Sequence, residues 1–192
     1  RELGPEHPSV AASLTNLAEM HREFGELEQA RALGEQALTL GEQALGPEHP
    51  NVATTLNNLG GTYLMRGDLE RAELLLTRAL TIREQALGGE HPEVGTTLNN
   101  LGELYQQRGD PDRARAMLQR ALAISEHARG PAHPDNAYNL LALASVAVAR
   151  DQLDEARTLG ARALVLREQA FGAEHPDVAR ALAELARVDI AR

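Results

Sequence analysis

Five histidines at a regular interval are the first side chains that could do chemistry. Each stands directly before a proline, and they fall 42 residues apart, at positions 7, 49, 91, 133 and 175. Zinc holds imidazole nitrogens at about 2.1 Å, so a shared ion needs ligands that converge on one point. Equivalent residues of stacked repeats lie about 10 Å apart, the spacing of packed helices. We therefore predict no metal site and expect each ring to fix the start of a helix beside its proline.

The carboxylates do not form an acid–base pair. Glu19 and Glu103 lie two repeat lengths apart, too far for two groups that must act on one substrate. No motif brings a serine, a histidine and an aspartate together, and the glycines stand where helices end, not in a phosphate-binding loop. We therefore expect no enzymatic activity and no cofactor.

Composition narrows the kind of partner. The 192 residues carry a net charge of −9, with a pI near 5.3. That balance disfavours nucleic acid and anionic membrane surfaces, which both attract basic proteins. The longest apolar run, Leu140–Ala149, is far shorter than the roughly 20 residues of a membrane span. We expect a protein or peptide partner that is neutral or basic and not strongly acidic, and we expect no nucleic-acid or membrane partner.

The residue types also indicate a cellular setting. There is no cysteine, which excludes disulfides and favours a reducing compartment, with the cytoplasm as the default. All 19 basic residues are arginine, which we interpret as the high-GC codon usage of a bacterium. Because Arg1 lies inside a repeat, we interpret the chain as a piece of a longer protein.

The 42-residue step indicates a repeat array in which each unit is a hairpin of two helices. In the second unit, Pro50 suits the first turn of a helix. The amphipathic stripe of that helix comprises Val52, Ala53, Leu56, Leu59, Gly60, Tyr63 and Leu64. Gly67 then supplies a left-handed stop and Asp68 a cap for the second helix. The buried side of the second helix comprises Leu69, Ala72, Leu75, Leu76, Ala79, Leu80, Ile82 and Ala86. The template predicts an all-α fold, an α-solenoid of antiparallel helix hairpins.

We expect one solenoid domain over residues 1–192. Its four hairpins cover residues 8–45, 50–87, 92–129 and 134–171, and a lone helix at 176–192 caps the array. Asp151 replaces the turn glycine of the fourth unit, because aspartate tolerates the left-handed conformation better than most residues. Gly34 and Gly160 stand inside second helices, where they indicate either close helix packing or a bend.

The motif of the second unit resembles the tetratricopeptide repeat. Its matching residues are Leu56, Leu59, Gly60, Tyr63, Gly67, Asp68, Ala72, Ala79 and Leu80. The third unit repeats them at Leu98, Leu101, Gly102, Tyr105, Gly109, Asp110, Ala114, Ala121 and Leu122. By length alone the period would also fit HEAT or armadillo repeats, since the usual tetratricopeptide unit has about 34 residues. The segments 80–88, 91–94 and 97–101 are similar to the long tetratricopeptide variety of kinesin light chains and related bacterial repeat proteins.

The resemblance implies a concave groove for an extended or helical peptide, lined by the first helix of each repeat. In related arrays the groove carries an asparagine that corresponds here to Asn16, Asn58 and Asn100, with Ala142 breaking the series. Neighbouring positions that should share this face are Asn57, Asn99, Glu19, Glu103, Thr15, Gly61, Leu141 and Ser145. The basic row with which some relatives grip an acidic tail is replaced here by Ala12, Thr54, Thr96 and Tyr138. An acidic peptide is therefore not the expected ligand.

A column of asparagines suits this role because an amide both donates and accepts hydrogen bonds. It can pair with a peptide backbone whatever the peptide's side chains. The alternative is that the asparagines bond within a hairpin, hold water or stabilise the seam between repeats. Adjacent helix residues do not face the same way, so Asn58 and Asn100 are better candidates than Asn57 and Asn99.

The first helix of the fourth unit is apolar nearly all round between Leu140 and Ala149, as buried helices are. Its groove side carries Tyr138, Leu141, Ser145 and Val148. Either the last helix covers this face, or the face is an open apolar pocket for a partner's side chain. In the open case, the asparagines would hold a peptide backbone while an anchoring side chain enters near Leu141.

We therefore expect an interaction module that binds a peptide or a protein in this groove. Two alternatives stay open. In one, the array is a regulatory or sensor segment of a larger multidomain signalling protein, and its groove binds that protein's own effector domain. In the other, it is a scaffold that self-assembles end to end.

Overall fold

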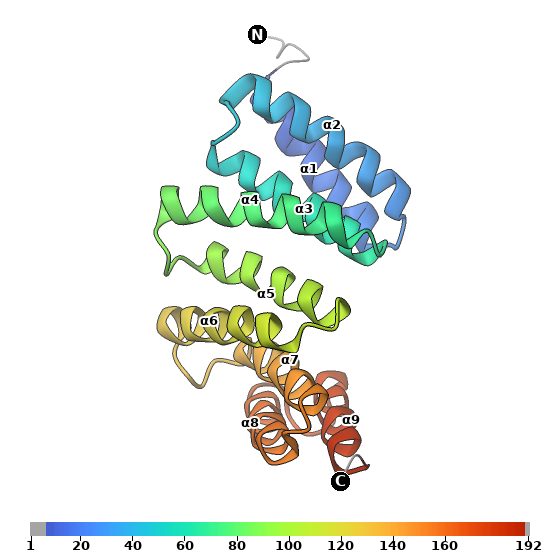
Figure 1. Cartoon of the computed structure of the whole chain (residues 1–192), viewed down its shortest axis with the longest axis vertical. Coiled ribbons are helices and arrows are strands. Elements are labelled where there is room, and N and C mark those ends of the chain that lie inside the picture. Colours follow the sequence, from blue (N-terminus) through green and yellow to red (C-terminus); the bar gives the residue numbers. More distant parts are fainter. Residues whose placement is uncertain (1–6, 191–192) are drawn as a thin grey trace. The chain divides into compact units, whose positions relative to one another are not determined.

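All regular structure in the part of the chain that the structure describes is helical. A computed structural model describes residues 7–190, except for the side chains of residues 177, 180, 184 and 187–190. The helices are α1 (Pro8–Glu23), α2 (Leu27–Leu45), α3 (Pro50–Met65), α4 (Leu69–Leu87), α5 (Pro92–Gln107), α6 (Pro111–Arg129), α7 (Asn136–Ala149), α8 (Leu153–Phe171) and α9 (Pro176–Ile190) (Figure 1).

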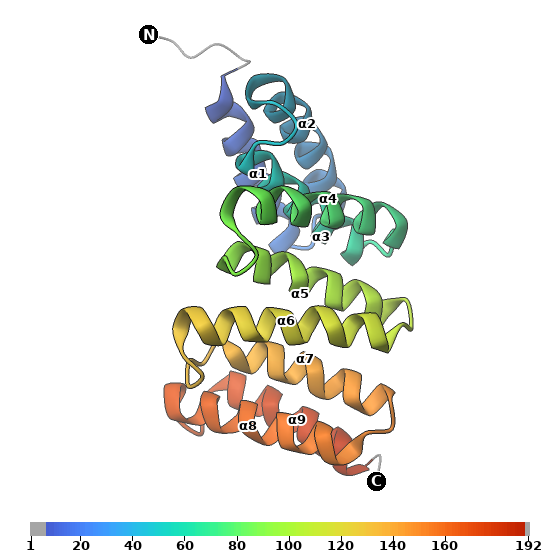
Figure 2. The ribbon, with the colours of Figure 1, turned by 60° about the vertical axis from the view of Figure 1, so that its left-hand side comes forward.

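Consecutive helices pair as antiparallel hairpins, such as α1 with α2, α3 with α4, and α7 with α8 (Figure 2). The second helix of one hairpin then packs on the first helix of the next, as α2 packs on α3 and α6 on α7. In the described part of the chain no second helix follows α9 to complete a hairpin, and α9 packs on α8 and α7. The predicted fold class, an α-solenoid of four hairpins with a terminal helix, is confirmed.

Two compact units make up the chain, Arg1–Asn100 and Leu101–Arg192, and their boundary falls within α5. The single-domain organisation stays a prediction, and the two units are considered separately below. In the first unit, Val52 and Leu56 of α3 pack with Ala79 and Ile82 of α4. In the second unit, a corresponding core joins α6, α7 and α8.

The turns inside the hairpins follow the predicted chemistry. Gly67 has φ 78°, and the Oδ1 atom of Asp68 accepts a hydrogen bond from the backbone N–H of Arg71 at 3.2 Å. In the fourth hairpin Asp151 adopts the same left-handed conformation with φ 59°, as predicted. These residues stop one helix and start the next without help from distant parts of the chain.

The repeated histidines fix the starts of first helices. The Nδ1 atom of His49 accepts a hydrogen bond from the backbone N–H of Asn51 at 3.1 Å, and His49 is the N-cap of α3. Equivalent bonds, all at 3.2 Å, are accepted by His7, His91 and His133. The predicted structural role is confirmed for His7, His49 and His91, whose neighbouring prolines begin α1, α3 and α5. In the fourth unit, however, α7 begins at Asn136, because residues 134 and 135 form a turn before it.

Close packing explains the glycines inside second helices. A Cβ atom at Gly34 would lie 3.0 Å from Leu59 Cδ1, and one at Gly160 would lie 2.8 Å from Leu185 Cδ2. In the second hairpin the roles reverse, since a Cβ atom at Gly60 of α3 would lie 2.8 Å from Leu76 Cγ of α4. A glycine on one helix therefore makes room for a leucine on its neighbour.

Leu17 of α1 stands 42 residues before Leu59, a member of the predicted apolar stripe, and yet it is 42% exposed. The equivalent Leu59 is 3% exposed and lies against Gly34 of the preceding hairpin. Among the described residues, no hairpin precedes α1 to cover Leu17 in the same way. Apolar spacing marks the face that can be buried, whereas burial also needs the neighbouring helix.

Candidate functional site

Most of the predicted groove asparagines of the first unit belong to one chain of hydrogen bonds. The Nδ2 atom of Asn58 donates to Glu19 at 3.1 Å, and Asn57 donates to Asn58 Oδ1 at 3.2 Å. Asn100 donates to Asn57 Oδ1 at 3.1 Å. These bonds tie the first helices α1, α3 and α5 to one another. They use one N–H of Asn58 and one of Asn100, and because an amide has two N–H donors and an acceptor oxygen, a peptide can bond to the remaining groups without replacing them.

Exposure separates the predicted site residues. Asn57 is 5% exposed, which agrees with the argument that adjacent helix residues face different ways. Asn16 is exposed on α1, and the half-buried members of the predicted set are Glu19, Asn58, Asn99, Asn100 and Glu103. In the first unit, Asn16 is thus the member of this set that presents the most side chain to solvent.

The apolar face of the fourth hairpin is covered at its centre. Leu141 is only 9% exposed and belongs to a core cluster with Leu166 of α8 and Ala181 of α9. Tyr138 is 45% exposed, and Ser145 is also exposed. Leu141 is therefore covered by the last helix, which was one of the two alternatives for this face. Tyr138 and Ser145 stay accessible to a partner.

A pocket of about 170 Å³ opens between α1 and α3 in the first unit. Its walls include Asn16 and Ala12 of α1, Gly41 of α2, and Asn51 and Thr55 of α3. Two of these residues, Ala12 and Asn16, belong to the rows of equivalent positions that the family resemblance assigns to the groove. The pocket therefore lies on the predicted groove face, where the sequence alone indicated asparagines but no cavity.

Sequence reasoning missed a buried arginine in the same unit. Arg83 of α4 is 4% exposed, and its guanidinium lies between α3 and α5. Burial lowers the pKa of Arg83, and the carboxylate of Glu93 opposes that shift. The sequence did indicate this burial, because position 83 lies on the same helix face as the buried residues Ala72, Leu76 and Ala79.

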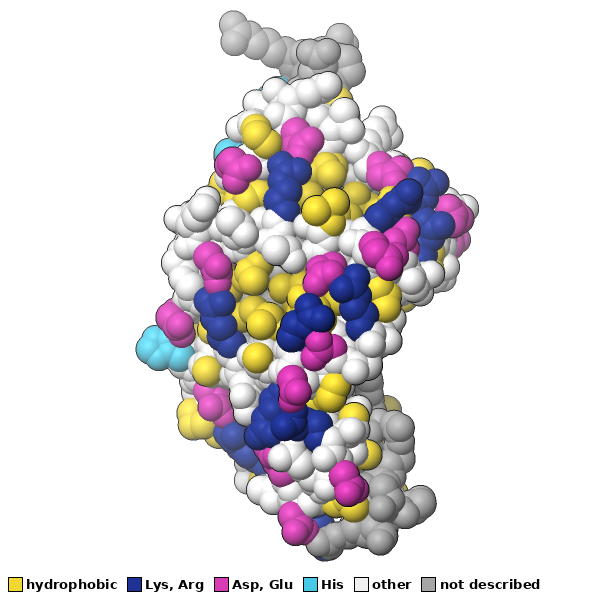
Figure 3. All heavy atoms as spheres, in the orientation of Figure 1, with side chains coloured by type: hydrophobic (Ala, Val, Ile, Leu, Met, Phe, Trp, Pro, Cys, Tyr) yellow, Lys and Arg dark blue, Asp and Glu magenta, His cyan; other side chains and the backbone are white. Residues whose placement is uncertain are grey.

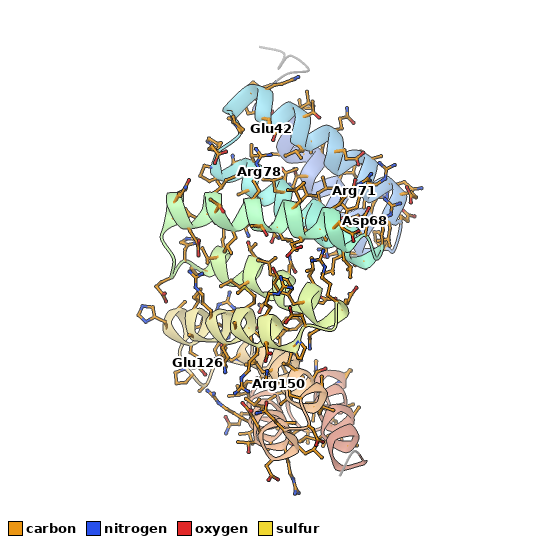
Figure 4. All side chains as sticks on the ribbon, viewed as in Figure 1. Glu42, Asp68, Arg71, Arg78, Glu126 and Arg150 are labelled. Carbon is orange, nitrogen blue, oxygen red and sulfur yellow. The ribbon has the colours of Figure 1, made fainter. Side chains whose placement is uncertain are left out.

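Several other arginines form ion pairs between neighbouring hairpins. Arg78 of α4 lies 2.6 Å from Glu42 of α2 (Figure 4). Arg66 at the end of α3 lies 2.6 Å from Glu28 of α2. In the second unit Arg162 of α8 pairs with Glu126 of α6 at 2.5 Å. On the face drawn in Figure 3, arginines lie beside acidic side chains and form no large field of one sign. Such solvent-accessible pairs contribute little to stability individually.

The described residues contain no group of three or more histidine, aspartate and glutamate side chains that could hold a metal ion. Within residues 7–190, no helix combines the length and the hydropathy that crossing a bilayer requires. What the site offers is a pocket, amides and hydroxyls on the faces of first helices. This arrangement can bind a peptide through hydrogen bonds and shape.

Comparisons with known proteins agree with the helical-repeat fold. The family model described as "Tetratricopeptide repeat" matches residues 9–85, 75–127 and 128–192. No curated protein matches the chain.

Several solved structures are similar over most of their length. A Podosopora anserina protein described as a kinesin light chain with nearly identical TPR-like repeats is 28% identical, with a TM-score of 0.81, over 96% of this chain and 88% of that one. A substituted form of that protein is 26% identical, with a TM-score of 0.82, over 99% and 89% of the two chains. BtubC (BKLC) from P. vanneervenii is 30% identical, with a TM-score of 0.78, over 92% and 69%.

Proposed function

The chain belongs to the tetratricopeptide-repeat family, and we propose that it binds a peptide or protein partner in the groove lined by the first helices of its repeats. Repeats of this family form non-catalytic scaffolds for protein–protein interaction, and the chain is an interaction module of this general kind. The proposal adds the location of the binding surface and the chemistry that it uses.

The pocket between α1 and α3 carries the proposal. It places the exposed amide of Asn16 beside a cavity of about 170 Å³, so an incoming peptide finds both a hydrogen-bonding group and a space for a side chain. The half-buried Asn58 and Asn100 continue the same rows on α3 and α5. Their bonds to Glu19 and Asn57 hold these amides in fixed orientations, which reduces the ordering that binding requires.

Selection of random displayed peptides against the 192-residue chain tests this proposal. Three variants serve as comparisons. Asn16→Ala and Asn58→Ala change the groove face, and Gln36→Ala changes an exposed residue on α2 instead. We expect enriched peptides whose dissociation constants rise at least about tenfold in both groove variants, the effect of about 1.4 kcal/mol, and stay within about twofold in Gln36→Ala.

Circular dichroism shows whether each variant is folded. Equal loss of binding in Gln36→Ala would place the binding surface elsewhere and contradict the groove. An absence of any enriched peptide for the folded parent protein would contradict peptide binding altogether.

A further inference from the structure

The pocket beside Gly41 has a filled counterpart one repeat further along the chain. Gly41 stands 42 residues before Arg83, so the two occupy the same position in α2 and α4. The Arg83 side chain passes between α3 and α5, where it is 4% exposed. At the seam between α2 and α3, glycine has no side chain to follow this path, and the pocket of about 170 Å³ is found there.

The contacts of Arg83 show which atoms bind a guanidinium group at this position. The Nη1 atom of Arg83 donates to the backbone carbonyl of Glu93 at 2.9 Å and to Thr97 Oγ1 at 2.7 Å. Its Nη2 atom lies 3.2 Å from the Glu93 carboxylate and donates to Thr54 Oγ1 at 3.5 Å.

Most of these acceptors recur in the pocket. Asn51 corresponds to Glu93 and supplies a backbone carbonyl at the same place, with an amide oxygen in place of the carboxylate. Thr55 corresponds to Thr97, while Ala12 replaces the weakest acceptor, Thr54.

The hydroxyl of Thr55 is able to accept a hydrogen bond. Its Oγ1 atom lies 2.8 Å from Thr15 Oγ1, and Thr15 donates its proton to the backbone carbonyl of Ala11 at 3.0 Å. Thr55 Oγ1 can also donate to the backbone carbonyl of Asn51 at 3.4 Å, as Thr97 donates to Glu93 at 3.2 Å while it accepts from Arg83. A hydroxyl has one proton and two lone pairs, so Thr55 keeps an acceptor site for an incoming N–H group. The pocket therefore presents acceptors, which suit a donor-rich ligand.

Packing does not require a glycine at position 41. A Cβ atom there would lie 3.6 Å from Val52 Cγ2 and 3.9 Å from Ala11 Cβ, which are ordinary contacts. Glycine is also unfavourable inside a helix compared with alanine. At the third seam the same position holds Ser125, which donates to Asn136 at 2.6 Å. What glycine provides at the first seam is the open space itself.

We propose that this pocket receives the side chain of an arginine that belongs to the partner, in the manner in which Arg83 fills the next seam. The apolar walls of Ala12, Leu45 and Val52 suit the methylene stem, while Asn51 and Thr55 bond the guanidinium. The net charge of −9 attracts a basic segment. This inference rests on the proposed groove function, and it specifies that the partner carries an accessible arginine.

Small probes test the pocket without a known partner. Nα-acetylarginine amide, the citrulline analogue and the norleucine analogue are titrated into the 15N-labelled chain. We expect saturable amide shifts at residues 12, 16, 41 and 55 with the arginine probe, and at least tenfold weaker binding of the norleucine probe. Citrulline keeps the shape and loses the charge, so it should bind between the two. Norleucine binding as tightly as arginine would overturn the assignment of a guanidinium pocket.

Variants at position 41 give matched controls. Gly41→Ala adds only a methyl group and should keep arginine binding, whereas Gly41→Arg supplies the side chain from within and should abolish it. Unchanged arginine shifts in folded Gly41→Arg would overturn the proposal.

If Gly41→Arg fails to fold, Thr55→Val is the deciding variant, because it removes a hydrogen-bond acceptor at nearly constant shape. It should weaken arginine binding at least fivefold, and an unchanged affinity would overturn the proposal.

The two proposals fail in different ways. Displayed peptides that bind the groove, contain no arginine and still bind Gly41→Arg would overturn the arginine pocket and leave groove binding in place. Binding of the arginine probe at residues 41 and 55, with no enriched peptide, would support the pocket and contradict peptide binding by the groove.

Discussion

The hydroxyl of Tyr63 in α3 donates a 2.5 Å hydrogen bond to a carboxylate oxygen of Glu35 in α2. Arg31 donates to the other oxygen of Glu35 at 2.6 Å. Burial acts to raise the pKa of Glu35, but the bonds from Tyr63 and Arg31 outweigh it and hold the pKa below its usual value. For Tyr63, burial and the bond to Glu35 both raise the pKa. The pair thus joins the first and second hairpins through one carboxylate.

Replacement of Glu35 should change how stability depends on pH. A carboxylate whose pKa is lowered on folding stabilises the fold above its unfolded pKa of about 4.3, and loses that contribution as the pH falls through the folded value. We expect Glu35→Gln to be less stable than the parent at pH 7, and the difference to shrink toward pH 3. Urea unfolding between pH 3 and pH 7 measures it. A difference that does not vary with pH would contradict the role of this carboxylate.

Loss of the ring at His49 should weaken the start of α3. His49→Ala removes the acceptor for the N–H of Asn51 and should cost about 1 kcal/mol in the free energy of unfolding. His49→Asn supplies another capping acceptor and should recover most of the loss. His127→Ala, at an exposed position, serves as a control within about 0.5 kcal/mol of the parent. If asparagine proved as damaging as alanine, the ring would act by packing and not as a cap.

The contact between Gly60 and Leu76 should be non-additive. Gly60→Ala places a methyl group against Leu76 and should cost about 1 to 3 kcal/mol. Leu76→Ala leaves a cavity and should cost about 2 to 5 kcal/mol. In the double variant the new methyl group occupies part of that cavity, so the cost should fall below the sum by about 0.5 to 3 kcal/mol. Additive free energies in chemical denaturation would show that the two sites do not share space.

Adjacent residues of α5 should differ sharply in their effect on stability. Leu101 is 2% exposed, and Leu101→Ala should cost about 2 to 5 kcal/mol by leaving a cavity. Asn100→Ala removes one hydrogen bond to Asn57 and should cost about 1 kcal/mol. Denaturation with urea compares them. Equal losses would make Asn100 a structural residue and weaken its assignment to the groove.

The features that could be predicted from the sequence are those in which a residue acts on its own neighbourhood. Gly67, Asp68 and Asp151 set the turns through their own backbone and side-chain preferences, so the helix boundaries followed from residue types. The bond between Asn57 and Asn100 joins residues 43 positions apart and depends on how two side chains are oriented across a seam. No periodicity encodes that orientation.

The pocket illustrates the same limit. Gly41 was visible in the sequence, but one glycine does not indicate a cavity until the path of Arg83 through the next seam is known. The position of Leu141 on the apolar stripe was likewise clear, whereas its coverage by Ala181 required the packing of α9.

Arg78, which forms an ion pair between two neighbouring second helices, also bonds to the loop that links their hairpins. Besides its pair with Glu42, Arg78 of α4 donates to the backbone carbonyl of Pro47 at 2.8 Å, within the loop that leaves α2. Arg162 holds the carbonyl of Pro131 in the same way at 3.2 Å. Each link is therefore closed by the hairpin that follows it. Opening of α4 alone should therefore make the segment near Pro47 easier for a protease to cut, even while α2 stays folded.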